Sequence, residues 1–284
     1  MNNSEIKALV SLLDDEDREI QIHVEQKIIS LGDAIIPFLE EEWENNLNLN
    51  VQKRIEDLIH LLQFESLKSK LRQWKEEGPQ DLLEGMWLVA TYQYPDLSLE
   101  KLKRELEQIY YDAWLEFRSN IHPFDQVKIL NSIMFSKLKF AANTKNFHSP
   151  SNCMLNIVLD SKRGNPISLC VIYMLVANKL KMPVYGVNLP NLFVLTYKAT
   201  DSQFYINVFS KGIIFSKSDI DKYIAQLNLP PSDIFYQPCS NMDIIKRVLR
   251  NLIISFEKTS DKDKVQEIKQ LLHVISDEPG DIAY

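Results

Sequence analysis

Residues 163–197 read RGNPISLCVIYMLVANKLKMPVYGVNLPNLFVLTY. This stretch joins a loop, a capped apolar helix and a pair of short strands with few residues between them. Asn165 before Pro166 predicts a helix start, because an asparagine side chain accepts a backbone N–H and proline loses no hydrogen bond at the first helical position. Apolar residues then follow on nearly every side, which predicts a buried helix. We expect the functional site to lie in this stretch.

The composition is that of an ordinary soluble globular protein. The chain has 284 residues, of which 45% are hydrophobic and 25% charged, and this length suits one large domain or two ordinary ones. It contains seven glycines, well below a usual content of roughly 7%. Because tight turns between β-strands often need glycine, this scarcity favours a mostly helical chain.

Charge and cysteine content exclude several classes of protein. The formal net charge of −7 argues against a general binder of nucleic acid, which presents clustered lysine and arginine. Three cysteines at unrelated positions form neither a disulfide framework nor a zinc-ligand spacing, so we expect a reducing compartment, no metal and no cofactor. No leader-like segment opens the chain, and no apolar run approaches the roughly 18 residues of a membrane span. We therefore expect a soluble cytoplasmic protein without membrane contact.

The first sixty residues contain an internal repeat of apolar spacing. Apolar residues at intervals of four, four and three predict one face of a helix, and the same pattern recurs 31 residues later. It resembles HEAT-like repeats, while an ordinary helical bundle fits the pattern equally well. The two copies are Ile20, Val24, Ile28 and Leu31, then Val51, Ile55, Ile59 and Leu62.

An acidic cluster lies between the two copies of this pattern. Its simplest interpretation is a solvated helix face with Trp43 turned inward. The alternative is a docking patch for a basic partner. The cluster consists of Glu40, Glu41, Glu42 and Glu44.

The remaining chain predicts helices, then a small antiparallel sheet, then helices again. Helices are expected at 80–92, from Ser98 as a hydroxyl cap to Trp114, and from Phe124, with a loop at 143–152. Short aromatic or β-branched runs predict strands at 183–187, 193–197, 204–209 and 213–215. A helix capped at Ser218 and two helices within 242–274 follow, and the last ten residues are expected to be frayed.

The fold class predicted from these elements is α+β, predominantly α. We expect four segments: helical repeats at 1–78, a helical region at 79–145, a core of buried helix and sheet at 146–240, and a helical hairpin at 241–284.

Two phrases of the central region carry a family resemblance. They are Arg163 to Leu169 (RGNPISL) and Gly186 to Pro190 (GVNLP), and LVATYQYPDLSLEKLKREL and KILNSIMFSKLKF precede them. The chain resembles the SirB-type branch of the transglutaminase-like superfamily from about Leu83 to Phe215. The resemblance implies a papain-like core, with a cysteine at the start of a buried helix, a histidine on the next strand and a carboxylate on the strand after it.

The three reactive positions implied by this resemblance hold other residues here. The nucleophile position falls near Pro166. The histidine of the usual Pro-Gly-His-Phe phrase corresponds to Leu192, and the aspartate of the following strand corresponds to Asn207. An asparagine can orient a histidine, but a leucine can neither accept a proton nor stabilise a thiolate. The resemblance thus implies the architecture of a cysteine-enzyme site without its reactive groups.

Other residues near the helix start are weaker catalytic candidates. Cys170 lies about one turn inside the helix. It could be a displaced nucleophile or a small buried hydrophobic residue. Ser168 reads as a nucleophile or as a capping or surface group. His148 is the only histidine that can be placed near the helix, but its spacing to Cys153 matches no known dyad. Arg163 could bind an anionic ligand or pair with Asp160 to fix the loop, and Asn165 shares the possible role in ligand binding or loop fixing.

Two functions of different class follow. The first is a catalytically degenerate transglutaminase-like protein that acts as a protein- or peptide-binding scaffold. The second is a thiol-dependent acyl-transfer enzyme, a hydrolase or cross-linker, that uses Cys170 with an unidentified base. The expected partner is a protein or peptide, with no nucleic acid, and the oligomeric state is left open.

Overall fold

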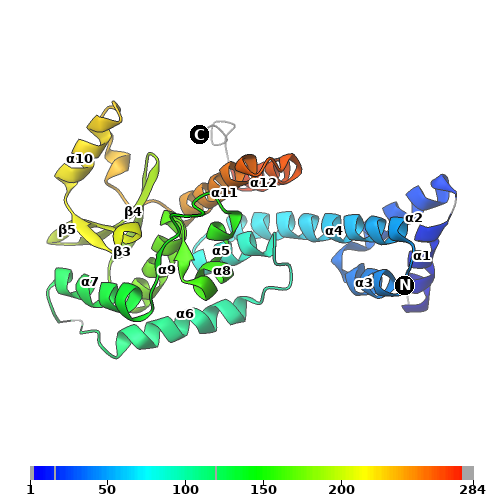
Figure 1. Cartoon of the computed structure of the whole chain (residues 1–284), viewed down its shortest axis with the longest axis horizontal. Coiled ribbons are helices and arrows are strands. Elements are labelled where there is room, and N and C mark those ends of the chain that lie inside the picture. Colours follow the sequence, from blue (N-terminus) through cyan, green and yellow to red (C-terminus); the bar gives the residue numbers. More distant parts are fainter. Residues whose placement is uncertain (1–2, 16, 119, 277–284) are drawn as a thin grey trace. The chain divides into compact units, whose positions relative to one another are not determined.

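The computed structural model describes residues 3–15, 17–118 and 120–276 (Figure 1). Helices dominate and the larger sheet is antiparallel, which confirms the predicted α+β, predominantly α class. Residues 277–284, within the end predicted to be frayed, lie outside the described ranges. In those ranges no helix combines the length and apolarity that a bilayer span requires.

The chain divides into two compact units, Met1–Gln73 and Trp74–Tyr284. The division falls within a long helix, α4 (Leu49–Glu76). The last three of the four predicted segments all belong mainly to the second unit.

The first unit consists of short helices around an aliphatic core. It contains α1 (Asn3–Ser11), α2 (Arg18–Leu31), α3 (Ile36–Asn45), α4 as far as Gln73 and two 3-10 turns, Leu12–Asp14 and Gly32–Ile35. Val24 and Ile28 of the first apolar pattern are buried together with Ile55 and Leu62 of the second. Ile20 is 39% exposed, because it lies in the first turn of α2, outside this core.

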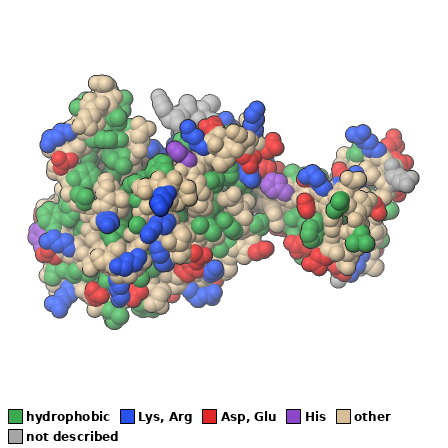
Figure 2. All heavy atoms as spheres, viewed as in Figure 1, with side chains coloured by type: hydrophobic (Ala, Val, Ile, Leu, Met, Phe, Trp, Pro, Cys, Tyr) green, Lys and Arg blue, Asp and Glu red, His purple; other side chains and the backbone are tan. Residues whose placement is uncertain are grey.

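Acidic side chains form a patch over α3 on the face shown in Figure 2. Trp43 in this helix is 37% exposed and donates its Nε1–H to Glu56 at 3.0 Å. The expectation that Trp43 turns inward is therefore wrong. The indole N–H is satisfied by a carboxylate at the surface instead of by burial.

Three helices open the second unit. They are α5 (Leu82–Thr91), α6 (Leu99–Trp114) and α7 (Pro123–Asn131), which continues into a π-helix at Ser132–Lys137. The apolar stripe of α6 buries Leu102, Leu106 and Ile109, as its spacing requires. Ser98 stands at the N-cap position of α6 but makes no side-chain capping bond, contrary to the expected hydroxyl cap.

The main sheet has four antiparallel strands in chain order. They are β3 (Val184–Leu189), β4 (Leu192–Ala199), β5 (Ser202–Asn207) and β6 (Ile213–Phe215), each within a few residues of its predicted range. Pro190 and Asn191 form the tight turn between β3 and β4. Asn191 has φ +57°, a left-handed conformation that asparagine tolerates well.

Helices cover the two faces of this sheet (Figure 1). On one face lies α9 (Pro166–Lys179), which is buried from Ile167 to Met174 as predicted and contacts β3 and β4. On the other face lies α10 (Lys217–Gln226), which packs into an apolar cluster with Val194 and Tyr205. The cap of α10 is a Ser216–Asp219 capping box and not the predicted Ser218.

Two further helices complete the unit. They are α11 (Asn241–Lys258) and α12 (Lys262–Ile275), with Ile245, Val248 and Leu249 buried as expected. A Ser240–Asp243 capping box starts α11. This helix contacts α5, α9, β3 and a 3-10 helix at Pro150–Cys153, which leads into α8 (Leu155–Ser161).

Candidate functional site

The start of α9 is held by its own cap and by a short parallel strand pair. β1 (Ala141–Ala142) pairs with β2 (Arg163–Gly164) directly before the helix. The Asn165 side chain accepts a hydrogen bond from the Ser168 N–H at 2.9 Å, and Pro166 is the first helical residue. The cap predicted from the Asn-Pro pair is thus confirmed.

A buried asparagine clamps the loop between β1 and the 3-10 helix. The Asn152 amide donates to the carbonyls of Asn146 and Phe147 at 2.7 and 2.9 Å and accepts from Asn143 Nδ2 at 2.8 Å. Its backbone carbonyl accepts a hydrogen bond from Ser168 Oγ at 2.5 Å, which ties the loop to the first turn of α9. The clamp fixes the loop segment that carries Phe147 and His148.

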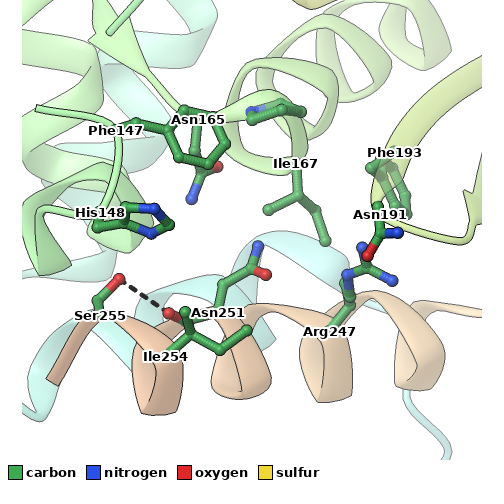
Figure 3. A pocket seen from close by; sticks show the side chains of 11 residues that line it. Phe147, His148, Asn165, Ile167, Asn191, Phe193, Arg247, Asn251, Ile254 and Ser255 are labelled. Atoms are coloured by element: carbon green, nitrogen blue, oxygen red, sulfur yellow. Dashed lines mark hydrogen bonds between the residues drawn. The ribbon is translucent and has the colours of Figure 1, made fainter. Parts of the chain in front are cut away.

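A cavity of about 270 Å³ opens at this helix start. Figure 3 shows side chains from four places pointing into it: the clamped loop, the first turn of α9, the β3–β4 turn and α11. Its lining contains no Asp, Glu or Cys among the described residues. The lining residues are Phe147, His148, Asn165, Pro166, Ile167, Asn191, Phe193, Arg247, Asn251, Ile254 and Ser255.

Arg247 of α11 brings a guanidinium group to the lining of this cavity. Its guanidinium donates to Asn188 Oδ1 of β3 at 3.1 Å, and within the described ranges no carboxylate forms an ion pair with it. Burial lowers the pKa of Arg247 from its ordinary value, and the charge of Arg250 one turn along α11 lowers this pKa further. A guanidinium nevertheless remains protonated in proteins, so the cavity holds a positive charge.

None of the three thiols, all of which lie in the described ranges, lines this cavity. Cys170 is fully buried, and its Sγ lies 3.7 Å from the Phe193 carbonyl oxygen. Burial raises the pKa of Cys170 well above its usual range, and it raises the pKa of both Cys153 and Cys239 to about 12. Raised pKa values keep these groups as thiols, the form without nucleophilic power.

The three positions that the resemblance implies as reactive do not meet. Pro166 borders the cavity. Leu192 packs in the apolar cluster on the α10 face of the sheet, opposite α9. Asn207 caps a 3-10 turn by accepting a hydrogen bond from the Ser210 N–H at 3.1 Å.

Ser168 and Arg163 make structural contacts. Ser168 is fully buried, so it is not a surface group, and its hydroxyl is committed to the Asn152 carbonyl. Arg163 donates to the carbonyl oxygens of Lys139 and Lys162 at 2.8 and 3.2 Å, and not to Asp160. The guanidinium therefore fixes the loop through backbone acceptors and not through the Asp160 carboxylate.

Of the three catalytic candidates, Cys170, Ser168 and His148, all within the described ranges, His148 is the one that lines the cavity. Its exposed imidazole points into the space next to Asn165, and Phe147 contacts it edge to face at 5.1 Å (Figure 3). No hydrogen bond joins His148 to a cysteine among the described residues. Over the same residues, no group of three or more His, Cys, Asp or Glu side chains is placed to hold a metal ion.

Sequence reasoning missed the wall that α11 contributes. Arg247, Asn251 and Ile254 follow one another at spacings of four and three, which places them on one helix stripe beside the buried residues of α11. That stripe was visible in the sequence. Nothing local, however, indicated that it would face the start of α9, more than 80 residues earlier in the chain.

We expect the thiols of the folded chain to react slowly with iodoacetamide. With pKa values of about 12 for Cys153 and Cys239, the thiolate fraction at pH 8 falls roughly 1000-fold below that of an ordinary thiol. Labelling should therefore rise steeply as the pH approaches 12, and urea should abolish the protection at pH 8. Intact-mass spectrometry over time measures this, and rapid modification of one cysteine at pH 8 in the folded chain would contradict it.

The central part of the chain is similar in sequence to known proteins. A family model described as Transglutaminase-like superfamily matches residues 100–250. A UPF0162 protein of Xylella fastidiosa is 26% identical over 216 residues, covering 70% of this chain and 73% of that protein. UPF0162 protein YchA of Escherichia coli is 25% identical over 175 residues, with coverage of 60% and 65%.

The similarity extends to a eukaryotic protein. F-box only protein 21 of Homo sapiens is 23% identical over 255 residues, which is 76% of this chain and 40% of that protein. No solved structure matches the chain. The family match covers more than half of the chain, including α9 and the whole sheet, and the chain therefore belongs to the transglutaminase-like superfamily.

Proposed function

We propose that this protein is a catalytically inactive transglutaminase-like protein that binds a peptide segment of a partner protein in the cavity at the start of α9. One observation carries the proposal: the cavity is open at the helix start, yet no cysteine of the described ranges lines it. An enzyme of this superfamily would present its nucleophile there. Here a proline occupies the first turn, and polar and apolar side chains suited to peptide contact surround it.

The arrangement of the other family positions supports this proposal. A histidine at position 192 would emerge on the α10 face, where Leu192 now contributes to an apolar cluster. Asn207 holds a turn. Each position thus has a structural use that needs no chemistry, as expected where a scaffold is retained for binding.

We propose further that the chain belongs to the SirB-type branch of the superfamily, because it contains the phrases RGNPISL and GVNLP. We also interpret the first unit as a short HEAT-like repeat, since Val24 and Ile28 of one copy and Ile55 and Leu62 of the other share one core. Such a unit would offer a second protein-binding surface.

The competing function is acyl transfer through Cys170. It requires a thiolate at the helix start and a base within hydrogen-bond reach. The Cys170 sulfur contacts the Phe193 carbonyl oxygen, and burial raises the pKa of the Cys170 thiol. A conformational opening of α9 would be needed before this thiol met a substrate.

Two measurements on the full chain test the proposal. In the first, the protein is incubated with a glutamine-containing peptide and a fluorescent primary amine. We expect no transfer above background, and the same result for Cys170→Ala. Transfer that disappears in Cys170→Ala would refute the inactive assignment.

In the second measurement, peptides are selected from a random display library on the wild-type protein. Ile254 lines the cavity and is 41% exposed, so Ile254→Trp fills the space. We expect the selected peptides to bind this variant at least about tenfold more weakly. Leu229→Trp is the matched control, because Leu229 is 39% exposed and lies outside the cavity. Peptides that bind both variants as tightly as wild type would show that the cavity is not the binding site.

A further inference from the structure

The cavity at the start of α9 contains a positive charge without a counter-charge. Arg247 lies half-buried on α11, and Asn188 Oδ1 is the single hydrogen-bond acceptor it has among the described residues. A guanidinium has five N–H donors, so most of them are left for water or a ligand. A partly buried cation without an anion is costly, and the binding of an anion would remove that cost.

Other hydrogen-bond donors face the same space. The side-chain amides of Asn191 and Asn251 and the backbone N–H of Ile167 have no hydrogen-bond partner among the described residues. Pro166 has no N–H, and the Ser168 N–H is taken by Asn165, so Ile167 presents the free donor of the first turn of α9. With the imidazole of His148, these groups surround the cavity on several sides (Figure 3).

The charge balance of the cavity favours an anion. Its lining includes Arg247 but, among the described residues, no carboxylate, in a chain whose net charge is −7. Arg250, one turn along α11, adds a second cation close enough to act on Arg247. The positive potential here is therefore local and runs against the charge of the whole protein.

The apolar part of the lining indicates what accompanies the anion. Ile254 and Phe193 border the same space as Arg247, and Phe147 closes it from the clamped loop. A phosphate is usually bound by several Arg or Lys side chains, whereas this lining, within the described part of the chain, holds one guanidinium. A carboxylate next to an apolar side chain uses one guanidinium and an apolar surface, which is the composition found here.

We propose that the cavity binds a peptide carboxylate, with Arg247 as its charge partner and the Ile254 and Phe193 side chains receiving the adjoining apolar residue. The inference rests on the proposed peptide binding and specifies what the site recognises. A carboxylate has two peptide sources, the free C terminus and the side chain of Asp or Glu. The geometry favours the C terminus, because its carboxylate and its last side chain share one carbon atom and reach both parts of the cavity.

Nuclear magnetic resonance of the full-length, isotopically labelled protein tests the proposal with small probes. N-acetyl-leucine represents the C terminus, N-acetyl-glutamate amide the acidic side chain, and N-acetyl-leucinamide the neutral control. We expect saturable shifts of the Ile167 N–H and Arg247 Nε–H signals with N-acetyl-leucine, at least about tenfold weaker binding of the glutamate probe, and no shift with the amide. N-acetyl-O-phosphoserine amide, which carries a phosphate and no carboxylate, is titrated in parallel.

Variants separate charge from fold. Arg247→Met should weaken N-acetyl-leucine binding by about tenfold or more, and Arg247→Lys should lose less. Arg104→Met is the matched control, since it removes an exposed arginine of α6 that lies outside the cavity, and we expect wild-type affinity. The comparison of acid with amide on the wild-type protein does not depend on any variant folding.

Equal binding of the acid and the amide, preferential binding of N-acetyl-O-phosphoserine amide, or no saturable shift with either carboxylate overturns the carboxylate proposal. If display-selected peptides still bind wild type and lose affinity in Ile254→Trp, peptide binding stands although the carboxylate proposal falls. Preferential, Arg247-dependent binding of the glutamate probe supports the carboxylate and reassigns its source to an acidic side chain.

Discussion

Gly212→Ala should destabilise the second unit by about 3–5 kcal/mol. Gly212 has φ +73°, in the left-handed region, and an added Cβ would lie 2.0 Å from Asn131 Oδ1. The amide of Asn131 cannot simply turn away, because its Nδ2 donates to the Gly212 carbonyl at 2.8 Å and its Oδ1 accepts from the Tyr173 hydroxyl at 3.1 Å. Tyr173 is fully buried in α9, so a displaced Asn131 leaves its hydroxyl with the longer bond to the Val127 carbonyl, at 3.5 Å.

The two parts of this cost can be separated with a matched glycine. Gly78 lies in the same unit with φ +87°, and an added Cβ there meets nothing within 4 Å. Gly78→Ala therefore measures backbone strain alone, about 1–2 kcal/mol. Urea unfolding followed by tryptophan fluorescence compares the two variants. Equal losses of unfolding free energy in the two variants would mean that the hydrogen bonds of Asn131 to Gly212 and Tyr173 contribute nothing to stability.

Local chemistry explains which parts of this fold the sequence predicts well. The cap at Asn165 and Pro166 needs only neighbouring residues, and so do the strands, whose aromatic and β-branched runs are bounded by turns. The start of α9 and the four-stranded sheet are therefore close to their predicted positions.

The face on which each strand residue lies could not be predicted in the same way. β4 is buried on both sides from Phe193 to Tyr197, so its residues show no apolar–polar alternation that would distinguish the two faces. Leu192 could therefore be aligned with a family position but not assigned to the α9 or the α10 side. The structure assigns it to the α10 side.

The cavity itself depends on contacts between distant parts of the chain. Arg247 reaches it because α11 packs on α9 and β3, and His148 reaches it because a buried asparagine holds its loop. Neither contact has a local signature. An arginine at the edge of the apolar face of an amphipathic helix is usually solvent-exposed. Arg247 lines a cavity instead because α11 packs near the start of α9.

Asn152→Ala should cost about 2–4 kcal/mol and should also release the loop that carries Phe147 and His148. The substitution removes three hydrogen bonds of a buried side chain, two donated to loop carbonyls and one accepted from Asn143. The bond from Ser168 to the backbone carbonyl of Asn152 is retained, so the effect is confined to the loop.

Hydrogen exchange distinguishes release of the loop from general destabilisation. In Asn152→Ala, amides of residues 143–149 should exchange faster at urea concentrations where α9 and the sheet are still fully protected. Asn152→Asp keeps the size of the side chain but removes both donated bonds, so it should behave similarly. Asn143→Ala removes one bond of the three, together with the bond that its Oδ1 accepts from the Asn146 N–H at 3.3 Å, and should lose about 1–2 kcal/mol. If the loop amides exchange in Asn152→Ala as they do in wild type, the clamp is not what positions His148, and the shape of the cavity must come from α11 and the β3–β4 turn alone.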